Sequence, residues 1–355
     1  MSSRDFQSEL YKCLKKYWGY SQFLEGQLEI CLNILKRKDS FVIMATGSGK
    51  SLTFQLPAVC LRECGYRATT IVVSPLISLI DDQVNALLSM GIPACAIGSS
   101  SNADIEQRAL QGEFTIVYAT PEKLLTWQHG LRELINSSHL ACLAVDESHC
   151  VSEWGHDFRP EYRRLGELRE IIGPKIPCVA LTASATISVQ ADIVRNLRLQ
   201  HPLVAKASLN RANLKYCVIN RTGPNDLLRL IHEYRKEQLI DHSPSVDKGT
   251  VPFYPTLIYV NSKKETEELA KLLVDCRLLA GIKVAFYHAG MNACDRSAVH
   301  MAFSKDEIQV VIATVAFGMG KRSLFVFNSV FFLQLYMSCR THTPKPPLSH
   351  IFILF

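Results

Sequence analysis

The chain has 355 residues and a formal net charge of +6, and 48% of its residues are hydrophobic and 20% charged. This composition excludes a disordered, collagen-like or coiled-coil protein, and the length indicates about two domains. The mild positive charge is compatible with a nucleic-acid partner but does not by itself indicate one.

The twelve cysteines occur singly, without a C-x-x-C pair or histidines at zinc-finger spacing. We therefore expect reduced, structural cysteines in a reducing compartment. The N-terminus lacks a signal-peptide pattern, and no apolar stretch reaches the roughly 18 residues of a membrane span. These features predict an intracellular, soluble protein without a membrane partner.

The first segment predicts a short amphipathic helix, because Phe6, Leu10, Leu14 and Tyr17 recur at helical spacing. From residue 41 onward, short apolar runs alternate with longer helical patterns. The runs lie at residues 41–44, 70–73, 114–118, 140–145 and 177–182. Runs of this kind, joined by crossover helices, predict a parallel sheet covered on both faces.

The alternation stops near residues 205–225, and a Pro-, Ser- and Asp-rich stretch at 239–255 indicates a surface loop. It restarts with apolar runs at 256–260, 283–287 and 309–314 and a charged helix at 263–276. We therefore predict two tandem α/β units. Residues 321–355 contain no Asp or Glu and fit neither pattern.

A glycine-rich segment, Met44-Ala-Thr-Gly-Ser-Gly-Lys-Ser51, follows the first run. Its glycines allow backbone N–H groups to surround a phosphate, and the start of the next helix adds partial positive charge. Lys50 would reach the β- and γ-phosphates of a nucleotide, and the Ser51 hydroxyl would bind Mg²⁺. The predicted nucleotide-binding residues here are Thr46, Gly47, Ser48, Gly49, Lys50 and Ser51. The alternative is a Gly/Ser turn with a chance lysine.

Two acidic residues, Asp146 and Glu147, end the apolar run at 140–145. At the carboxyl edge of a parallel sheet they would face the phosphate loop. Asp146 would hold the metal through water, and Glu147 would act as general base on the attacking water. Alone, this pattern also fits acids that merely solvate a strand end.

Asp146-Glu-Ser-His149 is similar to the D-E-x-H box of superfamily-two helicases, and Cys150–Tyr162 resembles the aromatic-rich loop of RecQ-family DNA helicases. Further segments resemble motifs of that family in the family's order, at residues 74–83, 118–122, 182–186, 287–290 and 313–320. The resemblance covers about residues 18–320. It implies two tandem RecA-like lobes with parallel sheets, of the P-loop NTPase class, the second lobe incomplete.

The resemblance also implies an ATP-dependent DNA helicase that moves 3′ to 5′ and unwinds DNA in repair or recombination, with single-stranded DNA and forked duplexes as its partners. The location would be the nucleus, or the cytoplasm if the protein is bacterial. The implied catalytic residues are Lys50, Asp146, Glu147 and His149. Gln27, with Tyr20 nearby, matches the adenine-reading motif, although the family's arginine is Leu24 here. A solvated helix position is the alternative for Gln27.

Trp154 and Phe158 would stack on unpaired bases, and Ser74, Arg159 and Arg163 would contact the DNA backbone. The alternative is that both aromatic residues belong to the core. The resemblance further implies coupling residues between the lobes, namely Thr182, Ser184, Thr186, Thr314 and Gly318. For the hydroxyl residues, a local turn or helix cap is the alternative.

After Gly320 the sequence departs from the family, whose Q-x-x-G-R-x-G-R segment supplies an arginine to the γ-phosphate. We therefore expect an ATP-binding lobe at 1–205, a junction at 206–255, a partial second lobe at 256–320 and an atypical tail at 321–355. Our hypothesis is that the tail is a splicing or gene-model artefact, and we expect little activity from this form. Alternatives are a non-catalytic module that binds ATP and nucleic acid, or an RNA helicase.

Overall fold

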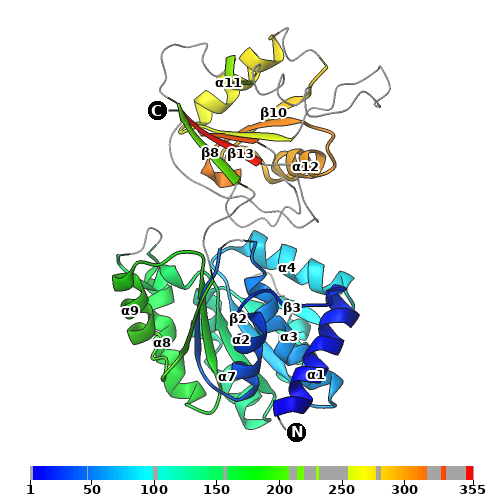
Figure 1. Cartoon of the computed structure of the whole chain (residues 1–355), viewed down its shortest axis with the longest axis vertical. Helices are drawn as coiled ribbons and strands as arrows, with labels where there is room; N and C mark the ends of the chain where they lie inside the picture. The colour runs from blue at the N-terminus through cyan, green and yellow to red at the C-terminus, as the bar shows by residue number, and fades with distance from the viewer. Residues whose placement is uncertain are drawn as a thin grey trace. The chain divides into compact units, whose positions relative to one another are not determined.

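Seven parallel strands form the sheet of the first unit, in the order β3-β4-β2-β5-β6-β1-β7 (Figure 1). Five strands match the predicted apolar runs: β1 (Ser40–Ile43), β2 (Thr69–Val73), β4 (Ile116–Ala119), β5 (Leu140–Val145) and β6 (Cys178–Thr182). The sequence did not predict β3 (Ala94–Ile97) or β7 (Leu203–Lys206). Both are edge strands, and their sequences, Ala-Cys-Ala-Ile and Leu-Val-Ala-Lys, contain few large apolar residues.

The computed structural model describes residues 3–45, 47–98, 103–154, 158–207, 214–219, 229–231, 255–276, 281–317, 329–332 and 349–354. It divides into two units, Met1–Asn210 and Arg211–Phe355. This boundary lies close to the expected end of the first lobe at residue 205.

Helices cover both faces of the first sheet. One face packs against α1 (Ser3–Cys13), η1 (Leu14–Trp18), α2 (Gln27–Leu35), α3 (Lys50–Glu63) and α4 (Ile77–Ser89). The other packs against α5 (Ala103–Leu110), α6 (Pro121–Thr126), α7 (Gln128–Asn136), α8 (Pro160–Ile172) and α9 (Ile187–Asn196). Successive strand residues alternate between the two cores, as Val42 and Ile43 do. The predicted parallel sheet with two covered faces is confirmed.

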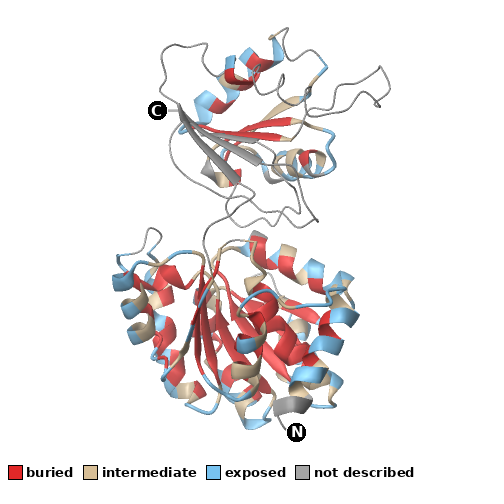
Figure 2. Ribbon diagram, viewed as in Figure 1, coloured by how far each residue is buried: buried red, intermediate tan, exposed pale blue. Residues whose placement is uncertain are grey.

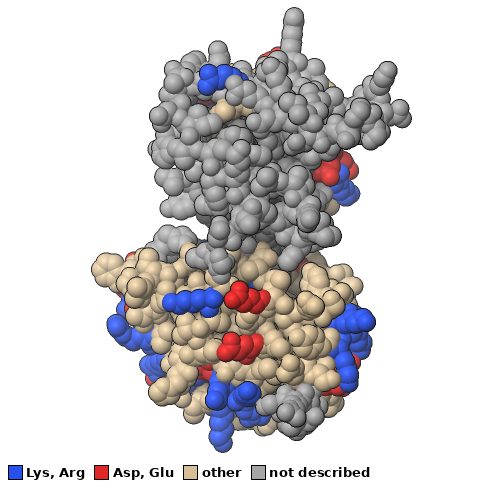
Figure 3. All heavy atoms as spheres, viewed as in Figure 1, with Lys and Arg blue, Asp and Glu red and all other residues tan. Residues whose placement is uncertain are grey.

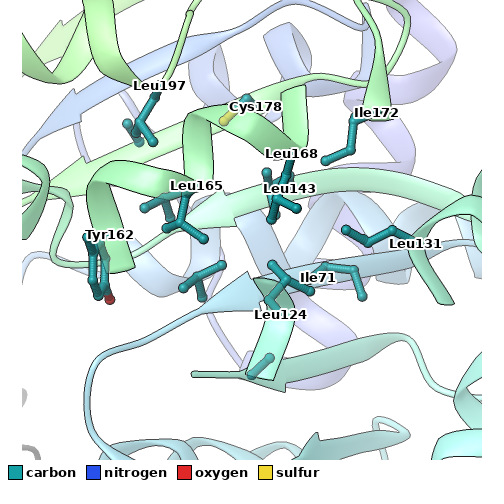
Figure 4. Close-up of a cluster of buried hydrophobic side chains, with 14 of the residues drawn as sticks. Ile71, Leu124, Leu131, Leu143, Tyr162, Leu165, Leu168, Ile172, Cys178 and Leu197 are labelled. Carbon is teal, nitrogen blue, oxygen red and sulfur yellow. The ribbon is translucent and has the colours of Figure 1, made fainter. Parts of the chain in front are cut away.

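Burial follows this layering. All strands of the first sheet except the edge strand β7 are almost wholly buried, whereas the outer faces of its helices are exposed (Figure 2). Figure 4 shows one of the two cores, in which Leu165 and Leu168 of α8 lie over Leu143 of β5. Leu10 and Leu14 of the predicted N-terminal helix are fully buried, with Phe6 and Tyr17 packed beside them. That amphipathic pattern is therefore confirmed.

The second unit has a parallel sheet of six strands, in the order β10-β11-β9-β12-β13-β8. Three strands match predicted runs: β9 (Thr256–Tyr259), β10 (Val284–Tyr287) and β11 (Val310–Ala313). The described helices are α11 (Lys263–Val274), α12 (Ala293–Ser304) and the short η4 (Val315–Phe317).

Three further strands of this sheet lie where the sequence predicted none. They are β8 (Leu214–Ile219), in the expected junction, and β12 (Ser329–Phe332) and β13 (Ser349–Leu354), in the tail. The interpretation that the tail fits neither pattern is therefore wrong for these two segments. Strands β12 and β13 are rich in Val, Ile or Phe, and their pairing partners are distant in sequence. For this reason no local pattern of strand, turn and helix predicted them.

No helix in the described part of the chain is long and apolar enough to cross a membrane. The ten cysteines whose side chains the structure describes are all free thiols, and most of them are buried. Burial raises the pKa of several of these thiols, that of Cys95 to about 12. They behave as the structural residues that the sequence predicted.

Candidate nucleotide and nucleic-acid site

The carboxyl edge of the first sheet gathers the predicted motifs. The phosphate loop follows β1, Thr182 ends β6, and Asp146 follows β5. In the register, Ile43 pairs with Thr182 and Val145 with Ala180. Because β6 lies between β1 and β5, about 10 Å separates the strands that carry the lysine and the acids. That spacing leaves the width of one strand between the loop and the acidic residues.

The phosphate loop depends on two glycines with left-handed backbone. Gly47 has φ +86° and Gly49 φ +75°, and Gly49 caps α3. A Cβ on Gly49 would lie 2.4 Å from Gln27 Nε2 and would displace that amide, and φ +75° is itself strained for any residue with a side chain. Lys50 Nζ donates to the Met44 carbonyl at 3.1 Å, and Ser51 is buried in the first turn of α3. Thr46 lies outside the described residues.

Gln27 holds this loop from α2. Its Nε2 donates to the carbonyls of Ser48 and Gly49, each at 3.2 Å, and its Oε1 accepts from the Leu24 N–H at 2.9 Å. With 3% of its surface exposed, Gln27 is not a solvated helix residue, and that alternative is wrong. The adenine contact stays a prediction. Tyr20, the other residue expected near adenine, is 46% exposed.

The two acids occupy a tight turn after β5. Glu147 has φ +48°, an uncommon conformation for a residue with a side chain, of the kind that concentrates at functional sites. Asp146 Oδ1 accepts from the Glu147 N–H at 3.0 Å. The Tyr162 hydroxyl donates to the Asp146 carbonyl at 3.1 Å. Tyr162 therefore fixes the turn.

Sequence reasoning missed the role of Tyr162. Its side chain is fully buried, and burial raises the pKa of its hydroxyl well above the ordinary value, so that it remains a proton donor. The local sequence signal for Tyr162 was its helical spacing to Leu165. This spacing predicts a core position but does not predict the contact with Asp146.

His149 connects the acidic turn to the end of β6. Its Nδ1 lies 3.1 Å from Thr182 Oγ1 and 3.5 Å from Glu147 Oε2. The Thr182 hydroxyl donates to the Ser184 carbonyl at 3.0 Å and accepts from the Ser184 N–H at 3.3 Å. Because its single proton is used there, Thr182 accepts from His149, which assigns the proton of the imidazole to Nδ1. Thus Glu147, His149, Thr182 and Ser184 form one chain of contacts.

The other predicted coupling residues that the structure describes lie outside this chain of contacts. Thr186 Oγ1 accepts from the Val189 N–H at 3.4 Å and caps α9, so for this residue the alternative of a local cap is confirmed. Thr314 follows β11 in the second unit and donates its N–H to the Tyr287 carbonyl at 3.1 Å. Gly318 lies outside the described residues.

The predicted DNA-binding residues differ in exposure. Trp154 is 79% exposed and Phe158 37%, so the alternative that both are core residues is wrong. Arg159 donates to the Pro75 carbonyl at 3.0 Å, and Arg163 pairs with Glu153. Both arginines thus contact protein groups, and their contacts with DNA stay predictions.

Ser74 was expected to face a nucleic-acid strand. It is only 2% exposed, and its hydroxyl has no hydrogen-bond partner among the described residues. The Ser74 hydroxyl is therefore covered by protein in this structure.

The residues present fit a magnesium ion. Ser51 and Asp146 supply hydroxyl and carboxylate oxygens, the donors that Mg²⁺ prefers. Among the described residues no group of three His, Cys, Asp or Glu could hold a metal by itself. Magnesium in nucleotide sites takes its remaining ligands from phosphates and water, which suits two protein oxygens.

The face of the first unit that Figure 3 shows has no broad basic area. Basic side chains lie mainly toward its margins, with acidic side chains near its middle. The nucleic-acid prediction for this unit depends on the exposed residues of the aromatic loop.

Two family models match the chain. The DEAD/DEAH box helicase model matches residues 25–193, and the helicase conserved C-terminal domain model matches residues 247–321. Together they cover most of both units.

Several curated proteins are similar in sequence. The ATP-dependent DNA helicase RecQ of Pasteurella multocida is 38% identical over 312 residues, which cover 86% of this chain and 45% of that protein. The bifunctional 3′-5′ exonuclease/ATP-dependent helicase WRN of Mus musculus is 41% identical over 313 residues, 87% of this chain and 21% of that protein. The chain thus spans less than half the length of these relatives.

Two solved structures show the same fold at 14% identity. Mycobacterium smegmatis helicase Lhr bound to ssDNA and AMP-PNP has a TM-score of 0.65 and is matched over 98% of this chain and 47% of that one. A variant of Saccharomyces cerevisiae Dbp5 bound to RNA and ADP BeF3 has a TM-score of 0.68, with coverages of 98% and 87%. The fold is that of tandem RecA-like helicase lobes.

Proposed function

The chain belongs to the RecQ family of ATP-dependent helicases, and on this premise we propose that it couples hydrolysis of Mg-ATP to 3′-to-5′ movement along DNA and to unwinding. The observation that carries the proposal is the gathering of the Lys50 loop and the Asp146–Glu147 turn at one edge of one sheet.

Each residue of this edge has a role in the proposal. Lys50 binds the β- and γ-phosphates, and Ser51 and Asp146 hold the magnesium ion, which neutralises phosphate charge when bound. Glu147 takes the proton of the attacking water. His149, held by Thr182 at 3.1 Å, orients the Glu147 carboxylate. The loop after β1 thus binds the phosphates, and the turn after β5 contributes both a metal ligand and the group that takes the proton.

DNA is the proposed polymer. The exposed Trp154 and Phe158 offer faces on which unpaired bases stack, at about 1–3 kcal/mol per base. The proposed substrates are single-stranded and forked DNA, in repair or recombination. A eukaryotic protein of this kind would work in the nucleus and a bacterial one in the cytoplasm.

We propose that a protein with this sequence hydrolyses ATP at a low rate. Residues 321–355 contain no Q-x-x-G-R-x-G-R segment, and an arginine at the γ-phosphate accelerates related reactions about 10³- to 10⁵-fold. The same observation favours a second candidate, a module that binds ATP and nucleic acid without unwinding.

One experiment compares these functions. ATP binding, ATPase rate and unwinding of a forked duplex are measured with single-stranded DNA, with single-stranded RNA and without either. We expect Mg-dependent ATP binding and a rate that rises with DNA more than with RNA. Binding without unwinding would support the second candidate, and a larger effect of RNA would support an RNA helicase.

The control for the nucleotide site is a pair of lysine variants. Lys50→Ala should abolish ATP binding, whereas Lys175→Ala, at an exposed position of the same unit, should leave it unchanged. Equal ATP affinity of the Lys50→Ala variant and the parent protein would refute the proposed site.

A further inference from the structure

Three buried polar side chains from separate elements meet inside the first unit. Gln55 of α3, Gln83 of α4 and Tyr118 of β4 are 3%, 4% and 1% exposed. Gln55 Nε2 donates to the Tyr118 hydroxyl at 2.9 Å and to Gln83 Oε1 at 3.4 Å. We name this set the Gln55 cluster.

The surroundings of the Gln55 cluster are apolar. Tyr118 belongs to the same hydrophobic core as Phe54, Val72, Ile80 and Leu87, residues that flank the glutamines in sequence or in the sheet. A buried carboxamide loses its water and regains stability only through hydrogen bonds. Gln83 Nε2 is buried without a hydrogen-bond partner among the described residues, which lowers the stability of the fold. An apolar side chain would therefore stabilise the fold more than Gln83 does.

Each element of the cluster leads to the carboxyl edge. Helix α3 begins at Lys50, and α4 begins three residues after Ser74. Strand β4 runs into Thr120, which caps α6. Helices and strands move as rigid elements. A shift of α4 therefore changes the contact of Gln83 with Gln55, and this contact affects the position of α3, the helix that begins at the phosphate loop.

We propose that Gln55 and Gln83 are positioning residues that link nucleic-acid occupancy at the aromatic loop, whose Arg159 contacts the Pro75 carbonyl just before α4, to nucleotide occupancy at the Lys50 loop. The inference rests on the proposed function, since it needs both ligands. The 3.4 Å contact is long, and the Gln83 amide has no hydrogen-bond partner among the described residues, so little hydrogen bonding at Gln83 opposes a shift of α4. A ligand that favours one arrangement of α4 thereby alters the other site.

The test measures binding linkage in the full chain and needs no turnover. The affinity for a fluorescent single-stranded DNA is measured by anisotropy with and without AMP-PNP, and the ratio of the two is the linkage factor. Gln83→Met keeps the size of the side chain and removes its polar atoms. We expect the linkage factor to fall about threefold or more. The melting temperature should stay the same or rise.

Two further variants complete the design. Gln55→Met should lower the linkage factor as Gln83→Met does, and the double variant should lower it no further, because both remove the same contact. The control is Thr69→Val, which removes a fully buried hydroxyl that donates to the Phe114 carbonyl at 2.7 Å from the opposite end of β2. It should lower the melting temperature and leave the linkage factor unchanged.

A linkage factor in Gln83→Met and Gln55→Met equal to that of the parent protein would overturn the inference while the proposed function stands. A parent protein that binds no single-stranded DNA, or binds it independently of AMP-PNP, would instead overturn the coupling that the proposed function requires.

Discussion

His149 Nδ1 lies 3.1 Å from Thr182 Oγ1, and this contact joins the turn after β5 to the end of β6. The same nitrogen lies 3.5 Å from Glu147 Oε2, so the hydroxyl of Thr182 fixes an imidazole that borders the proposed general base. The orientation of Glu147 is thereby tied to a strand that ends beside the phosphate loop.

Thr182→Val should lower the DNA-stimulated ATPase rate about three- to tenfold and leave ATP binding unchanged, because it removes one hydrogen bond from His149 without a change in size. Steady-state rates at saturating ATP measure the effect. Thr186→Val is the matched control, since it removes the cap of α9 and should lower only stability. Equal rate losses in the two variants would contradict the role of Thr182.

Trp154→Ala should weaken single-stranded DNA binding by about 1–3 kcal/mol, roughly five- to 150-fold, because one stacking face is lost. ATP affinity should be unaffected, and stability should change by about 0.5 kcal/mol or less, since the side chain is 79% exposed. Tyr66→Ala, at an exposed aromatic residue between α3 and β2, is the control. Unchanged DNA affinity in Trp154→Ala would rule out stacking.

Gln27→Ala should weaken ATP and GTP binding together, about three- to tenfold each, because its two donated hydrogen bonds hold the Ser48 and Gly49 carbonyls in place. Titration of both nucleotides into the variant measures this. A loss confined to ATP would show instead that the carboxamide reads adenine.

Asp39→Ala or Arg169→Ala should each destabilise the first unit by about 3–5 kcal/mol, because each leaves a buried charge without its partner. The two side chains pair at 3.1 Å with 4% and 5% exposed, and Asp39 also accepts from the Cys178 and Gln200 N–H groups at 2.7 Å. Urea unfolding measures the loss. Arg164→Ala, which removes an exposed pair with Glu167, should change stability by about 0.5 kcal/mol or less.

The stability of the first unit should fall as pH falls below about 6.5. Burial, with Arg67 and Arg62 nearby, lowers the pKa of His139 from its ordinary value of 6.5. Below that value the unfolded chain binds a proton that the folded chain takes up only at lower pH, so protonation favours unfolding. His139→Asn should flatten this dependence in urea unfolding between about pH 7.5 and 5.5. An unchanged pH dependence in His139→Asn would contradict the assignment.

The sequence by itself determined the elements whose signals are local. The apolar run at 140–145 is a strand with those bounds, and the phosphate loop and acidic turn are contiguous groups of residues that precede or follow strands. Strands β3, β7, β8, β12 and β13 were not predicted, because they show no clear local pattern and pair with neighbours distant along the chain.

Only the tertiary structure decided which partner each polar side chain takes. Arg159 contacts the Pro75 carbonyl 84 positions earlier, Gln27 holds a loop about 20 positions later, and the Ser74 hydroxyl is covered. A pattern of residue types records what a side chain is able to bind, but packing brings distant groups within hydrogen-bond reach and excludes water from them. For that reason the motifs could be predicted from the sequence, whereas the contacts among them could not.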